Sequence, residues 1–173
     1  MNRSPLFLPF TLALFAHFFS TLFFPSIRIL AFVPFLVILF QRKSLLLSLW
    51  AAALCGGIVD LSNSDSHFGL FALSYLSTAV FMFPQRIHFF EDRIQTLPIY
   101  TFIFSLLFTI FHFIFFSFFH GLIRLSWKGL TTNFLFTPML DGLYAFFWFT
   151  CPLLLYTLLT TRKRKYKPKG YYS

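Results

Sequence analysis

Apolar residues gather in six long runs, which charged residues, prolines and short polar stretches separate. A helix needs roughly 20 apolar residues to cross the hydrocarbon core of a bilayer. Six crossings of that length would use most of the 173 residues and leave only short loops and tails. The pattern therefore predicts an all-α integral membrane protein, a bundle of six transmembrane helices. The runs cover residues 6–24, 29–40, 44–59, 68–83, 94–123 and 134–159.

The second run, residues 29–40, is short for a spanning helix. It could cross with little tilt, or Arg28 could extend its side chain toward the surface so that its aliphatic stem lengthens the apolar segment. A re-entrant hairpin is the alternative, and it would change the number of crossings.

Basic residues fall unevenly on the two sides that six crossings define. One side holds eleven and the other holds Arg28, Arg124 and Lys128. Because cytoplasmic loops carry the excess of Lys and Arg, both termini should be cytoplasmic. The eleven are Arg3, Arg42, Lys43, Arg86, Arg93, Arg162, Lys163, Arg164, Lys165, Lys167 and Lys169.

Composition agrees with a membrane location. The chain is 58% hydrophobic and 11% charged, whereas soluble domains carry about 25% charged residues. We expect one polytopic transmembrane domain, residues 1–161, and a basic cytoplasmic tail, residues 162–173, which attracts anionic lipid at about 1 kcal/mol per basic residue. The net charge of +9 is mostly local to that tail, so we expect no nucleic-acid partner.

Other local features fit membrane spans. The N-terminal apolar stretch is too long for a typical signal peptide and lacks a clear cleavage site, so we interpret it as the first helix. Cys55 and Cys151 both lie inside apolar runs and form no pattern of a disulfide framework. The 30 phenylalanines either replace leucine against lipid or pack against partner helices.

Charged residues inside the membrane are costly, so each is a functional candidate. Asp60 ends the third run and Asp141 lies some two turns into the sixth, both toward the outer side, with Asp65 in the outer loop. Asp60 and Asp141 could share a polar pocket, or each could cap a helix end facing water.

Signatures of enzymes and of metal sites are missing from the sequence. His112 and His120 lie eight residues apart, which is about 80° around a helix, and no HExxH accompanies them. There is no G-x-S-x-G elbow and no Gly-rich phosphate loop. We expect a protein that is not an enzyme and needs no metal or cofactor.

Small residues in the third run form two overlapping pairs. Ala52 precedes Gly56 by four positions, and Ala53 precedes Gly57 by four. Such pairs let two helix backbones approach closely, which drives helix association in lipid. The contact could lie within this chain or with a partner.

The segment around these pairs resembles the signature of MreD, a bacterial rod shape-determining membrane protein. Gly-Gly-Ile-Val-Asp (56–60) is followed by a short polar stretch and then by Phe-Gly-Leu-Phe-Ala-Leu (68–73). The positions that carry the resemblance are Gly57, Asp60, Gly69, Ala72 and Leu73. The run from Thr137 to Ala145, which includes Asp141, is similar to the last helix of that family.

The resemblance implies a non-enzymatic component of the cell-elongation machinery in the bacterial cytoplasmic membrane. It implies association with an MreC-like protein, an MreB-like actin, a RodA-like synthase and a class B penicillin-binding protein. It also implies a fold similar to the substrate-binding subunits of energy-coupling-factor transporters. The alternative is therefore a vitamin-type binding subunit, for which Asp60, Asp65, His67 and Asp141 offer a thin set of polar groups and Trp127 lies nearby.

Overall fold

A computed structural model describes residues 7–23, 29–63, 68–85, 96–120 and 131–151. These residues form helices and contain no strand, which confirms the all-helical class. Each of the six apolar runs contains one helical segment. The helices are α1 (Phe7–Phe23), α2 (Val33–Arg42), α3 (Leu45–Ser62), α4 (Leu70–Met82), α6 (Leu97–His120) and α8 (Thr137–Ala145).

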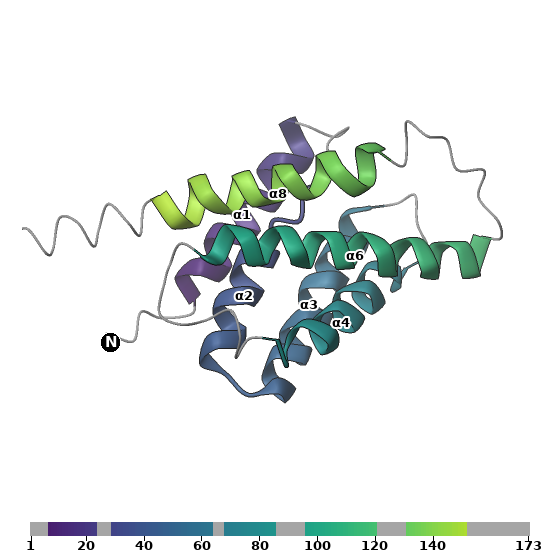
Figure 1. Ribbon diagram of the computed structural model, residues 1–173, viewed down its shortest axis with the longest axis horizontal. Coiled ribbons are helices and arrows are strands. Elements are labelled where there is room, and N and C mark those ends of the chain that lie inside the picture. Colours follow the sequence, from purple (N-terminus) through teal and green to yellow (C-terminus); the bar gives the residue numbers. More distant parts are fainter. Residues whose placement is uncertain (1–6, 24–28, 64–67, 86–95, 121–130, 152–173) are drawn as a thin grey trace, which may run out of the picture.

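The last helix is continuous with two wider turns. The π-helical segments η2 (Thr132–Phe136) and η3 (Phe146–Thr150) flank α8 directly. Two threonine hydroxyls bond to the carbonyl five residues earlier, which is the spacing of a π-helix. Thr137 donates to the carbonyl of Thr132 at 3.1 Å, and Thr150 donates to that of Ala145 at 3.3 Å. Figure 1 shows this rod lying along α6, antiparallel to it.

Two of the described helices are long and apolar enough to cross a membrane. They are α3, Leu45–Ser62, and the stretch Leu97–Phe119 within α6. The helices α1 and α4 are apolar but shorter. This is evidence for membrane association by length and composition.

The second run forms a short helix. The 10 residues of α2 extend only about 15 Å at 1.5 Å per residue, about half of the hydrocarbon core. Pro34 stands in the first turn, where its missing N–H costs nothing. The residues before it, Leu30 to Phe32, form a buried turn that is not helical. The helical part of this run is therefore shorter than the run itself.

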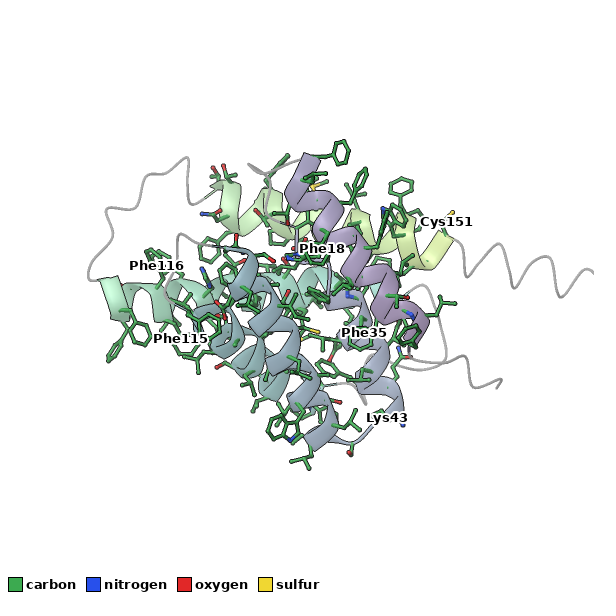
Figure 2. All side chains as sticks on the ribbon, turned by 180° about the vertical axis from the view of Figure 1, so that it is seen from behind. Phe18, Phe35, Lys43, Phe115, Phe116 and Cys151 are labelled. Carbon is green, nitrogen blue, oxygen red and sulfur yellow. The ribbon has the colours of Figure 1, made fainter. Side chains whose placement is uncertain are left out.

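Helix α2 lies inside the bundle. Val33, Leu36, Val37 and Phe40 are fully buried, and α2 contacts α1, α3 and α6. It ends at Arg42, and the extended backbone of the next residue, Lys43, leads directly into α3. Figure 2 shows Lys43 at the end of the bundle where α2 is followed by α3.

The phenylalanines serve in two environments. Phe40, Phe104 and Phe108 are buried, and the rings of Phe40 and Phe104 lie 6.3 Å apart. Others, such as Phe15 and Phe118, point away from the bundle, Phe118 with 85% of its surface exposed. Among the described residues, some rings therefore pack between helices of this chain and others cover its outer surface, where contact with lipid or with a partner stays a prediction.

Candidate functional sites

Asp60 joins the end of α3 to the start of α4. Its side chain is 5% exposed. Oδ1 accepts a hydrogen bond from the backbone N–H of Phe71 at 3.0 Å, and Oδ2 accepts one from that of Ala72 at 3.0 Å. These N–H groups lie in the first turn of α4, where no intrahelical acceptor is available. Asp60 therefore caps the next helix with both oxygens, and its negative charge suits the positive end of that helix.

Close contact of backbones completes this junction. A Cβ atom on Gly56 would lie 2.4 Å from Cα and 2.8 Å from N of Ala72, and 3.0 Å from the carbonyl oxygen of Phe71. Only a hydrogen atom fits there. Ala52, one turn earlier, is fully buried. The first small pair, Ala52 and Gly56, thus faces the interior, with Gly56 directly against α4.

The second small pair lies on a different side of α3. A Cβ on Gly57 would meet none of the described residues within 4 Å, and Ala53 and Gly57 are both half-buried. Of the two contacts that the sequence leaves open, the described part of the chain shows the one within the chain at Gly56 and not at Gly57, because neighbouring residues point about 100° apart around a helix. Contact of Ala53 and Gly57 with a partner stays a prediction.

Gly69 supplies the turn that leads into α4. Its φ is +96°, in the left-handed region that side chains disfavour. It precedes the first residue of α4 and accepts the N–H of Leu73 at 2.9 Å. Gly56, Asp60, Gly69 and Ala72 therefore meet at one junction, which we call the α3–α4 junction.

Asp141 holds a different part of the chain. It is fully buried. Oδ1 accepts the backbone N–H of Leu30 at 2.8 Å, and Oδ2 accepts the hydroxyl of Ser105 on α6 at 2.5 Å. One turn along α8, the hydroxyl of Tyr144 points at the carbonyl of Ala31 at 3.5 Å. These side chains, which we call the Asp141 clamp, fix the turn before α2 to α6 and α8.

The clamp satisfies backbone that no helix satisfies. A buried backbone N–H without a partner is costly. The turn at Leu30 is buried and not helical, and Asp141 accepts its N–H. The sequence also allowed Asp60 and Asp141 to share a polar pocket. The structure does not bring them together, because Asp60 accepts hydrogen bonds from the start of α4, whereas Asp141 accepts them from Leu30 and from Ser105 on α6. Asp65, His67, Trp127 and the tail, residues 162–173, lie outside the described residues.

Two histidines make polar contacts between helices. Nε2 of His17 on α1 lies 3.1 Å from the hydroxyl of Ser62, which donates to the carbonyl of Ile58. Since that hydroxyl has one hydrogen, Nε2 of His17 is the donor. Nδ1 of His112 lies 3.4 Å from the hydroxyl of Ser74. Within the described residues, no three His, Cys, Asp or Glu side chains group as metal ligands.

Sequence reasoning did not identify Ser105, Tyr144 or Ser62. A signal for Ser105 was present, because Thr101, Ser105 and Thr109 recur every four residues in an otherwise apolar run and so share one helix face. Tyr144 lies three positions after Asp141, also on the same face. The partner at Leu30 gave no signal, because a backbone N–H has no sequence signature.

Comparisons with family models, with curated proteins and with solved structures found no match to this chain.

Proposed function

We propose that this chain is a multi-pass protein of the bacterial cytoplasmic membrane, with its six helical runs crossing the bilayer and both termini in the cytoplasm. The apolar outer surface supports this proposal, since exposed leucines and phenylalanines occur on every helix except α2. Soluble proteins rarely expose apolar surface so widely. The division of basic residues, eleven against three, supports the orientation.

Within that membrane, we infer a non-enzymatic role in the cell-elongation machinery, of the kind that MreD-like proteins have. The chain would organise peptidoglycan synthesis by holding an MreC-like protein, and through it the MreB-like actin, the RodA-like synthase and the class B penicillin-binding protein. No cofactor enters this role.

The observation that carries the proposal is the α3–α4 junction. Residues of the MreD-like segment meet there, with Asp60 capping α4, Gly69 turning into it and Ala72 lying against Gly56. A segment whose residues build one helix junction is a fold signature, and a shared signature of that kind favours a shared fold. The capping role of Asp60 also engages both of its oxygens with the backbone, which favours a structural role for this carboxylate over catalysis.

Co-purification tests the proposal. An affinity-tagged chain is expressed in bacterial membranes with an MreC-like protein, solubilised in mild detergent and captured. We expect the MreC-like protein to be retained in stoichiometric amounts, and an unrelated multi-pass protein of similar size to be absent. Capture of the folded chain without the MreC-like protein would contradict the proposal.

A matched pair of variants then sharpens the test. Gly57→Leu adds bulk on the outer side of α3, where a Cβ meets nothing, so the chain should fold normally. If the partner docks on that side, Gly57→Leu lowers retention of the MreC-like protein at least tenfold. Leu54→Ala, also on α3, removes bulk from an exposed position and serves as the folding control.

A further inference from the structure

Helix α1 buries few of its residues, and two of the three are alanines. Its buried residues are Ala13, Ala16 and His17, whereas its large side chains on the other side are exposed. Phe10, Leu12 and Leu14 are partly buried against the core. Among the described helices, α1 has close contacts mainly with α2, whereas α3 packs extensively against α4 and α6 packs extensively against α8.

The aromatic contacts of α1 with other described elements converge on one short stretch. The ring of His17 lies 5.3 Å from that of Phe32, and the ring of Phe10 lies 6.3 Å from Phe32 and 5.3 Å from Phe35. Figure 2 shows Phe35 beside α1. Helix α1 therefore rests mainly on the turn before α2 and on the first turn of α2.

A single side-chain hydrogen bond joins α1 to another element within the described part of the chain. It is the bond from His17 to Ser62 at the end of α3. By contrast, α3 and α4 meet backbone to backbone at Gly56 and share the two bonds of Asp60.

The stretch on which α1 rests is itself fixed from the other side. The Asp141 clamp holds Leu30 to α6 and α8. When α1 moves, Leu30 therefore stays in place, and α2 keeps its position in the bundle. In lipid such a movement meets little resistance, because acyl chains are as apolar as the helix surfaces that separate and no hydrophobic force holds the helices together.

We propose that α1 is a hinged flap that leaves the bundle as a unit, pivots at the clamped turn before α2, and is latched by the bond from His17 to Ser62. Opening uncovers Phe32 and Phe35, which lead into the otherwise buried helix α2. The inference rests on the proposed membrane location. It gives the bundle two states, a closed one with α2 sealed and an open one with α2 accessible from within the bilayer.

Distances between spin labels test this proposal in lipid bilayers. In a background of Cys55→Ala and Cys151→Ala, labels are attached at Phe15→Cys on α1 and Leu54→Cys on α3, both exposed positions. We expect two distance populations. Ser62→Ala, which removes the latch without altering α1, should raise the longer-distance population at least threefold.

Two controls separate the outcomes. Labels at Leu54→Cys and Val80→Cys, on α3 and α4, should give one narrow distance that Ser62→Ala does not change. A single α1–α3 distance that Ser62→Ala leaves unchanged would overturn the flap, as would equal broadening of both pairs. His17→Phe removes the same hydrogen bond from the α1 side and keeps an aromatic ring against Phe32, so it should raise the longer-distance population as Ser62→Ala does. If the chain fails to float with liposomes, the proposed membrane location fails instead.

Discussion

Replacing Gly56 with alanine should weaken the bundle far more than the same change at Gly57. The added Cβ would lie 2.4 Å from Cα of Ala72, whereas ordinary contacts begin at 3.4 Å, so α3 and α4 must separate by about 1 Å. The obstacle is backbone, which cannot rotate aside as a side chain does. The same movement stretches the bonds from Phe71 and Ala72 to Asp60, both 3.0 Å long.

The expected magnitude follows from these two effects. Overpacking costs about 1–3 kcal/mol, and loss of one hydrogen bond to a charged group costs about 1.5–3 kcal/mol. We therefore expect Gly56→Ala to lower the free energy of unfolding by roughly 2.5–6 kcal/mol. At Gly57 the added methyl meets no described atom within 4 Å, so the change should be neutral or stabilise α3 by up to about 1 kcal/mol, because glycine is a poor helix former.

The assay is reversible unfolding in mixed micelles of mild detergent and sodium dodecyl sulfate, followed by tryptophan fluorescence. Wild type, Gly56→Ala and Gly57→Ala are compared in the same micelles, so that effects on the unfolded state largely cancel. If the two variants unfold at the same detergent fraction, the close approach at Gly56 does not limit stability and the reasoning fails.

Three further predictions concern the same junction and the orientation of the chain. Asp60→Asn should lower the free energy of unfolding by about 1.5–3 kcal/mol, because both oxygens of Asp60 accept hydrogen bonds from N–H donors and an amide nitrogen cannot accept. Equal stability of Asp60→Asn and wild type in the same micelle assay would refute this. Gly69→Ala should lower the free energy of unfolding by about 1–2 kcal/mol, because the φ of +96° disfavours a side chain, and Gly69→Asn should lower it less. Equal stability of wild type and both variants would show that the turn adopts another conformation. Reporter fusions at Asp65 and at the C-terminus should report opposite sides of the membrane, and agreement between them would make the six-span count wrong.

The helices of this fold were predictable because each apolar run is continuous and ends at charged, polar or proline residues. Their contacts were not. On sequence alone Gly56 and Gly57 are equivalent, and only the position of α4 determines which one meets a backbone. On sequence alone Asp60 could cap a helix end, which needs one acceptor; that both of its oxygens accept hydrogen bonds there depends on the position of α4.

The limits of helix α2 show the same difference between local and distant information. Its run of apolar residues begins at Ile29, yet the helix begins at Val33. Pro34 explains why a helix starts there. The unwound turn before it depends on Asp141, whose partner Leu30 lies 111 positions away in the chain. The π-helical turns at the two ends of α8 were likewise not predictable, because no residue pattern indicates them.

The burial of α2 affects how freely the sequence can vary. A side chain that faces lipid can change between phenylalanine and leucine with little effect, because the acyl chains adapt to either shape. Residues of α2 have no such freedom: helices contact it on several sides, and loss of a buried methylene leaves a gap that rigid neighbours do not fill. Homologous sequences should therefore exchange Phe and Leu often along the outer side of α1 and rarely at Leu36 or Phe40, although both helices consist mostly of apolar residues. In this protein, the helix that varies least would be one of the short ones, which its neighbours surround in the bundle.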